Sequence, residues 1–254
     1  MKTTTSDGVL HLTFDRPESM NAFNSDAAIE LADAIESADP ENHDAVVLTG
    51  EGEAFSAGGD IEAMAEREES PREAYERVNE TYGRVAESMF TCPVPIVAKV
   101  NGDAVGAGLA VTALSDFAYA VEDARFSCAF VHVGLVPDTG GSYLLPRLVG
   151  LRAAKRLVFT GEFFDAEDAA DLGLITEAVP AGQLDERVSE LLETLADRPT
   201  ETIALAKQAI HGNLGRRWDD ALEYETMLQI QAYGTEAHEE GVSAFLDDRK
   251  PKFD

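Results

Sequence analysis

The apolar positions of this chain follow two different periods. Short apolar runs of strand length lie at residues 9–14, 45–49, 95–100 and 116–120. Apolar residues at helical spacing occupy 27–38, where Asn24, Ser25 and Asp26 offer an N-cap, and 108–114, where the segment is apolar on all sides. Because strand and helix patterns alternate along the chain, the sequence favours α/β layering over an all-β sandwich.

The pattern changes after Pro199, where all the remaining signals are helical. Apolar stripes at helix period lie at 200–211, 221–233 and 238–247. We therefore expect an α/β core over residues 1–197 and a helical C-terminal region over 198–254. The apolar faces of this region can cover either the core or a neighbouring subunit, and we interpret the region as an oligomerisation element.

Composition agrees with a globular protein that folds without disulfides. The chain has 254 residues, 44% of them hydrophobic, and it contains no apolar run of membrane-spanning length. Its first eight residues are too polar for a secretory signal, so we expect no membrane association and a cytoplasmic location. Cys92 and Cys128 have apolar neighbours and no metal-ligand spacing, which predicts reduced packing residues and no metal site.

The charge of the chain is strongly negative. Acidic residues number 48 and basic residues 20, for a formal net charge of -28. Such a field repels nucleic acid, which excludes nonspecific binding to it. At about 1 M salt the Debye length falls to roughly 3 Å and the self-repulsion is screened, so the composition indicates a halophilic source. The acidic residues are scattered along helix patterns, which is typical of a solvated surface.

Two small-residue segments each lie between a strand signal and a helix signal. The first is FSAGGD at 55–60, followed by the helix-compatible residues 61–67, and the second is GAGL at 106–109. Amide groups at a helix start point toward negative charge, so two facing turns can share one oxygen atom. The alternative is that the glycines only permit tight turns. Neither segment has the spacing of a dinucleotide-binding, Walker A or nucleophile-elbow motif.

Five ordered sequence blocks resemble the crotonase (enoyl-CoA hydratase/isomerase) superfamily over essentially the full length. They are FDRP at 14–17 with NAF at 21–23, then 54–61, 100–109, 134–148 and 241–253. The resemblance implies an α/β crotonase fold, which is a ClpP-like spiral of ββα units with a C-terminal helical appendage. It also implies an acyl-CoA thioester substrate and a homotrimer or dimer of trimers.

The resemblance also implies which residues form the site. The oxyanion hole falls on the amides of Ala57 and Ala107, and one such donor is typically worth about 10²–10³ in rate. Coenzyme A is part of the substrate, so no separate cofactor is expected. The positions that match the family's CoA contacts are Arg16, Asn21, Ala22, Ala57, Asp60, Ile61 and Lys250. A basic C-terminus that stabilises a helix dipole is the alternative role of Lys250.

One pair of positions departs from the hydratases of this family. Their two glutamates, which hold a water molecule and transfer its protons, align here with Ala110 and Phe130. Neither side chain can transfer a proton, so hydration is in doubt.

A carboxylate does occur nearby, at Asp138 in the segment PDTGG at 137–141. Its apolar neighbours would raise its pKa and the start of the expected helix 142–148 would lower it, and the alternative role is a cap of that helix. The segment, with LPR at 145–147, resembles the branch that includes ring-epoxide isomerases of phenylacetyl-CoA breakdown, in which this Asp is the acid/base. We therefore predict an enoyl-CoA isomerase, or a related ring-epoxide rearrangement, in which Asp138 shifts a proton.

Other functions remain as alternatives. These are an enoyl-CoA hydratase of fatty-acid β-oxidation and an acyl-CoA-binding homologue without activity. An aryl-CoA dehalogenase would need a histidine near the first turn, and the histidine nearest the Asp138 segment is His132, which we interpret as a core or surface residue. A Clp-type protease would need a Ser–His–Asp arrangement, and none accompanies the two turns of this chain. Candidates for the acyl pocket are Met64, Tyr75, Tyr82, Met89, Phe130 and Tyr143.

Overall fold

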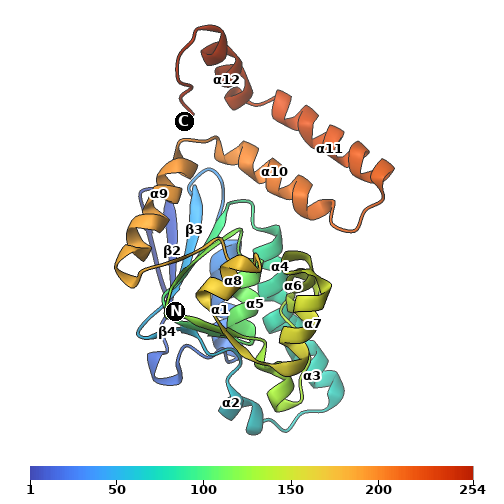
Figure 1. The fold of residues 1–254 in the computed structure, drawn as a ribbon. Coiled ribbons are helices and arrows are strands. Elements are labelled where there is room, and N and C mark those ends of the chain that lie inside the picture. The colour runs from blue at the N-terminus through green and yellow to red at the C-terminus, as the bar shows by residue number, and fades with distance from the viewer. Residues whose placement is uncertain (254) are drawn as a thin grey trace.

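A computed structural model describes residues 1–253, which fold around two sheets (Figure 1). The larger sheet has the strand order β1-β2-β3-β5-β7-β10, with β1 antiparallel to β2 and all other pairs parallel. Its strands are β1 (Lys2–Ser6), β2 (Val9–Phe14), β3 (Ala45–Gly50), β5 (Ile96–Val100), β7 (Phe117–Val121) and β10 (Glu177–Val179). The central strands are apolar along their whole length because both faces of the sheet are covered.

The smaller sheet has the strand order β4-β6-β8-β9. Its strands are β4 (Ala54–Ser56), β6 (Asp103–Val105), β8 (Arg125–Ser127) and β9 (Phe163–Asp165). The β4–β6 and β6–β8 pairs are parallel, and β9 is antiparallel to β8. Each strand has three residues, too few for a periodic signal, and the sequence did not predict this sheet as such.

Helices cover both sheets. They are α1 (Ser25–Glu36), α2 (Ile61–Ala65), α3 (Pro71–Val78), α4 (Arg84–Thr91), α5 (Ala107–Leu114), α6 (Gly141–Leu148), α7 (Gly150–Thr160), α8 (Ala166–Asp171) and α9 (Leu184–Ala196). A π-helical segment, Asn79–Gly83, joins α3 to α4, and single 3-10 turns lie at Pro17–Ser19, Ala129–Val133 and Ala181–Gln183. All eight residues of α5 are buried, which explains why its sequence is apolar on every side.

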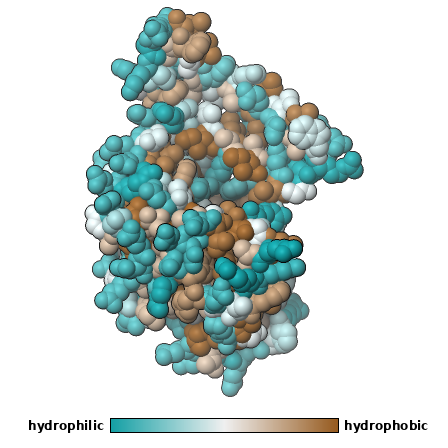
Figure 2. Space-filling model, in the orientation of Figure 1, coloured by the Kyte–Doolittle hydropathy of each residue, from teal (hydrophilic) through white to brown (hydrophobic). Residues whose placement is uncertain are grey.

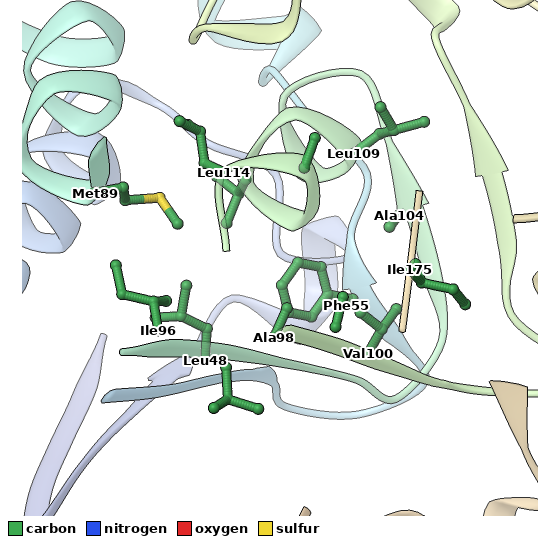
Figure 3. Packing of buried hydrophobic residues seen from close by; sticks show 14 of the residues in the cluster. Leu48, Phe55, Met89, Ile96, Ala98, Val100, Ala104, Leu109, Leu114 and Ile175 are labelled. Atoms are coloured by element: carbon green, nitrogen blue, oxygen red, sulfur yellow. The ribbon is translucent and has the colours of Figure 1, made fainter. Parts of the chain in front are cut away.

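The core lies between the larger sheet and the helices. Met89 on α4, Leu114 on α5 and Ile96 on β5 face one another in this layer (Figure 3). Cys92 and Cys128 are buried and free, as the sequence predicted. The predicted helix at 27–38 is α1, and the side chain of Asn24 caps it by accepting a hydrogen bond from the Ala27 amide at 2.9 Å.

The C-terminal helices are α10 (Thr200–Gly212), α11 (Trp218–Tyr233) and α12 (Glu236–Leu246). The buried ammonium group of Lys207 ties α10 to the core, because it donates to Asp116 at 2.6 Å and to the Val94 carbonyl at 3.2 Å. Helices α11 and α12 extend away from the core (Figure 1), and Trp218 and Phe245 are 80% and 86% exposed. Apolar atoms are visible on the surface of this region (Figure 2), and its role in oligomerisation remains a prediction. No helix in residues 1–253 is both long and apolar enough to span a membrane.

Candidate active site

The two small-residue turns lie at the same edge of the smaller sheet. The first follows β4 and the second follows β6, and these two strands are parallel neighbours. Because the carboxyl ends of parallel strands meet at one edge, the turns are brought together. A Cβ added at Gly58, where φ is +89°, would lie 2.5 Å from the Val105 carbonyl oxygen and 3.2 Å from the Ala107 nitrogen. Only glycine fits at this approach, so the turns are in direct contact.

The amides of the first turn are not equally free. Ala57 donates to the Met20 carbonyl at 2.9 Å, Gly58 to the Ser56 hydroxyl at 3.2 Å, and Asp60 to the Phe23 carbonyl at 2.9 Å. The amide of Gly59 donates to no acceptor within residues 1–253. In the described residues the Ala57 N–H group is thus already bound, whereas the Gly59 N–H group is the free donor of this turn. The oxyanion role of Ala57 stays a prediction.

The second turn presents the amide of Ala107. This residue is the first of α5, and its N–H group has no partner in the described chain because it precedes the first intrahelical bond, Ala110 to Gly106. The helix dipole adds positive potential at the same point. The free amides of Gly59 and Ala107 thus lie on two turns that touch, which is the arrangement needed to hold one oxygen that gains negative charge.

Asp138 lies beside the start of α6 but does not cap it. Helix α6 has no side-chain cap, and the carboxylate of Asp138 accepts a hydrogen bond from the Thr139 hydroxyl at 3.0 Å. Thr139 is buried in the left-handed region at φ +48°, a strained conformation for a β-branched residue. Thr139 and Ala107 line the same small interior space, so the Asp138 segment lies next to the second turn.

Burial raises the pKa of Asp138, and the hydrogen bond from Thr139 opposes this rise without cancelling it. The direction that the sequence left open is therefore upward. A half-buried carboxyl group with a raised pKa is a stronger base than an ordinary aspartate when ionised, which suits the removal and return of a proton. Such a perturbed group beside a pair of free amides marks a candidate catalytic centre.

Of the two positions that align with the hydratase glutamates, Ala110 packs against the segment that carries Asp138 and Phe130 precedes that segment in the chain. A Cβ added at Gly141 would lie 3.5 Å from Cβ of Ala110 and 3.7 Å from Cβ of Pro137, so α5 packs against the Asp138 segment at Ala110. Phe130 is half-buried in the 3-10 turn that precedes this segment. His132, on the same turn, is exposed and lies with Nε2 3.3 Å from the Thr160 carbonyl.

Comparison with known proteins decides the family. Residues 4–254 match the model described as enoyl-CoA hydratase/isomerase. The chain belongs to this family. It is 38% identical to the "Probable enoyl-CoA hydratase" of Rhodobacter capsulatus, over 98% of this chain and 95% of that protein, and 34% identical to the 1,2-epoxyphenylacetyl-CoA isomerase of Escherichia coli K12, over 97% and 95%.

Solved structures confirm the predicted crotonase fold for this enoyl-CoA hydratase/isomerase family member. An enoyl-CoA hydratase from Mycobacterium smegmatis superposes with a TM-score of 0.92 at 32% identity, covering 99% of this chain and 98% of that one. The names of the relatives are divided between hydratases and isomerases, so the family assignment leaves the reaction open between the two.

Of the residues expected to contact CoA in this family member, Arg16 and Asp60 form a pair. The Arg16 guanidinium donates to Asp60 at 2.9 Å and to the Ala22 carbonyl at 2.5 Å. Asp60 also caps α2 by accepting from the Ala63 amide at 3.0 Å, and these partners, Ala63 first and Arg16 second, lower the pKa of its carboxyl. Ile61 is 52% exposed at the start of α2 and is accessible to a ligand.

Asn21 and Ala22 lie in the buried loop beside the first turn. Both Nδ2 hydrogens of Asn21 are bound, to the Glu51 and Ala54 carbonyls at 2.9 and 2.8 Å, and its Oδ1 accepts from the Arg16 amide. Both residues are buried. The hydrogen bonds of Asn21 therefore hold the first turn in place, and both residues line a surface pocket together with Arg16. Their contact with CoA stays a prediction.

Lys250 does not join the other CoA candidates within one chain. It follows α12 and is exposed, and Figure 1 places this end of the chain at the opposite end of the molecule from α2. Its neighbour Arg249 is bound to Glu240 at 2.6 and 2.8 Å, and this pair lowers the pKa of Glu240 to about 2. The basic charge next to Lys250 is therefore partly neutralised by a glutamate of the preceding helix.

Proposed function

We propose that this family member isomerises an enoyl-CoA, or a ring-epoxide CoA ester, by a proton shift at Asp138. The observation that carries the proposal is the state of this carboxyl group. It is half-buried, it caps no helix, its pKa is raised, and it lies in the segment that packs against the start of α5.

The reaction needs one carboxylate and one oxyanion site. With the thioester oxygen between the amides of Gly59 and Ala107, a 3-enoyl thioester becomes acidic at its α-carbon. The Asp138 carboxylate removes that proton, and the two amides stabilise the resulting dienolate. The protonated Asp138 then returns the proton to the γ-carbon, which leaves a conjugated 2-enoyl thioester and a regenerated carboxylate.

Hydration is the weaker candidate because it needs more proton-transfer groups. A water molecule must be held in place, and its hydroxyl group and proton must be added to two different carbons. The side chains of Ala110 and Phe130 can neither bind the water nor transfer its proton. The similarity to the 1,2-epoxyphenylacetyl-CoA isomerase of Escherichia coli K12 supports the same choice. The similarity to the "Probable enoyl-CoA hydratase" of Rhodobacter capsulatus is the observation that favours the alternative.

The CoA moiety is proposed to lie along Ile61 and the Arg16–Asp60 pair. Within one subunit Lys250 lies at the opposite end of the molecule from α2 (Figure 1). We therefore propose that it contributes from another copy in a trimer or dimer of trimers. The phosphate groups of CoA would bind a basic side chain such as that of Lys250. Basic residues are few in this chain, whose net charge is -28.

The test is Asp138→Asn, assayed with a 3-enoyl-CoA by the ultraviolet absorbance of the conjugated product. The exposed Asp123→Asn is the matched control. Asp138→Asn should abolish double-bond migration and leave binding of the CoA ester nearly unchanged, whereas Asp123→Asn should behave as the unaltered enzyme. Unchanged isomerisation in Asp138→Asn would remove the assignment. When a 2-enoyl-CoA is supplied instead, fast loss of its absorbance with both variants would identify a hydratase. Binding of the CoA esters without turnover of either by the unaltered protein would identify a non-catalytic homologue.

A further inference from the structure

Tyr82 is a buried tyrosine whose polar end points at the first turn. It lies on the π-helical segment Asn79–Gly83 and is 5% exposed. Its hydroxyl donates a hydrogen bond to the Phe23 carbonyl at 2.7 Å. π-Helical turns inside α-helices are uncommon and occur often at functional sites, so Tyr82 is a candidate for a functional role.

Phe23 is the residue that holds Gly59 from both sides. The Phe23 amide donates to the Gly58 carbonyl at 2.6 Å, and the Phe23 carbonyl accepts from the Asp60 amide at 2.9 Å. These two bonds form an isolated parallel bridge between Phe23 and Gly59. The first bond holds the Gly58–Gly59 peptide, which carries the Gly59 N–H group, and the second holds the Gly59–Asp60 peptide. The bridge therefore restrains both peptide planes that meet at Gly59, and with them the direction of its N–H group.

The Tyr82 hydroxyl is therefore the second donor on the carbonyl that orients Gly59. It also lies beside Gly59 itself, since a Cβ added there would be 3.9 Å from the hydroxyl oxygen. The ring lines the same interior space as Ala107 and Thr139, so one side chain contacts the surroundings of both amides and of Asp138. Burial raises the pKa of Tyr82, which keeps the phenol protonated and a donor.

We propose that Tyr82 is a positioning residue for the oxyanion site: its hydroxyl, acting through the Phe23 carbonyl, fixes the direction of the Gly59 amide. This inference rests on the proposed function, in which Gly59 and Ala107 hold the thioester oxygen. Tyr82 itself touches neither the transferred proton nor the thioester oxygen. Its effect should appear in how strongly the carbonyl is polarised and not in how tightly the CoA ester binds.

The variant that isolates the hydroxyl is Tyr82→Phe. It keeps the ring and its packing, and the Phe23 carbonyl keeps the Asp60 amide as a partner, so no buried acceptor is orphaned. Loss of one net hydrogen bond that acts on the transition state corresponds to about a tenfold fall in kcat, with KM changed little. The matched control is Tyr233→Phe, because Tyr233 is 54% exposed on α11 and is not among the acyl-pocket candidates.

The deciding measurement uses a 4-dimethylaminocinnamoyl-CoA thioester, whose absorbance moves to longer wavelength when its carbonyl oxygen is polarised. Binding is followed in the Asp138→Asn background, so that no turnover occurs and the result does not depend on the reaction assigned above. The Asp138→Asn protein and its Tyr233→Phe derivative should give the same red shift. The Tyr82→Phe derivative should give a clearly smaller one at a similar Kd.

A full red shift in the Tyr82→Phe derivative would overturn the inference while leaving the oxyanion site intact. Absence of a red shift in the Asp138→Asn protein itself would instead overturn the oxyanion site, and the inference with it. If Tyr82→Phe fails to fold, 3-fluorotyrosine at position 82 replaces it, because the more acidic phenol is a stronger donor. The red shift should then increase, and an unchanged shift would count against the inference.

Discussion

Asp60 and Asp138 each stand at the N-terminal side of a short helix beside the two glycine turns, yet their environments are opposite. Asp60 caps α2 and pairs with Arg16, and these partners lower its pKa. Asp138 leaves α6 uncapped, has only the hydroxyl of Thr139 as a side-chain partner in the described chain, and has a raised pKa because it is buried. The same residue type thus serves as a fixed anion in one place and, in the proposed reaction, as a reversible proton carrier in the other.

The difference teaches how a carboxylate is kept available for chemistry. A helix N-terminus and a guanidinium stabilise the charged form, so a carboxylate that accepts both is held ionised and loses its value as an acid. Withholding these partners from Asp138 costs stability, and the strained Thr139 beside it adds to that cost. Asp60 by contrast contributes to the rigidity of the turn that carries Gly59.

The largest expected effect is on turnover. Asp138→Asn should lower kcat for double-bond migration by about 10²–10⁴, because it removes the acid/base group. Asp60→Asn keeps the helix cap and should lower kcat by less than about tenfold, with a rise in KM from the altered Arg16. Steady-state kinetics on a 3-enoyl-CoA measure both. Equal losses in the two variants would break the distinction between them.

The next effect is on the pH profile. Asp138 must be ionised in the free enzyme to remove a proton, so kcat/KM should fall about tenfold per pH unit below its pKa. Since burial raises this pKa, the acidic limb should lie above the ordinary Asp value of about 3.9. The limb should stay in place in Asp60→Asn. A limb at or below the ordinary value would contradict a buried proton carrier.

A smaller effect is on stability at Asp60. Asp60→Ala removes the cap and the Arg16 pair and should cost about 1–2 kcal/mol, a fall in Tm of roughly 2–6 °C. The folded pKa is lowered, so the charge-dependent part of this contribution is present above the unfolded pKa and is lost as pH falls toward the folded one. Thermal melts at pH 7 and pH 3 should therefore differ in the size of the loss.

The smallest effect has the opposite sign. The folded pKa of Asp138 is raised, so ionising it destabilises the protein increasingly as pH rises from the unfolded pKa through the folded one. Asp138→Asn should thus raise Tm at pH 7, on the order of 1–3 °C, and the gain should shrink below the unfolded pKa. A variant that melts lower than the unaltered protein at pH 7 would show that Asp138 has a stabilising partner.

Much of this arrangement could be predicted from the sequence, since a long segment with a clear hydrophobic period fits only one type of secondary structure. The helix behind Asn24 and the all-apolar helix ending at Leu114 were expected within one or two residues of where they lie. Asp138 was identified because a lone carboxylate stands among apolar residues. The second sheet was not predicted, since three-residue strands are specified by partners far away in the chain and not by local period.

The sequence could not show which amide of the first turn is free, that of Ala57 or that of Gly59, for a related reason. Which amide of a turn is free depends on where the carbonyls of Met20 and Phe23 lie, and both come from a loop more than thirty residues earlier. The same holds for the side chain of Asn21, which forms hydrogen bonds with three backbone groups that the sequence does not reveal. Composition cannot distinguish a bound polar group from a free one.

The π-helical segment at Asn79–Gly83 also limits how this chain can change length. A π-turn holds one residue more than the α-turn it replaces, and deletion of that residue would turn every later position of the helix by about 100° relative to the earlier ones. Tyr82 would then leave the Phe23 carbonyl, or α4 would lose its buried face. Insertions and deletions should therefore be tolerated in the loop before α3 and selected against inside this helix, whatever residues it contains.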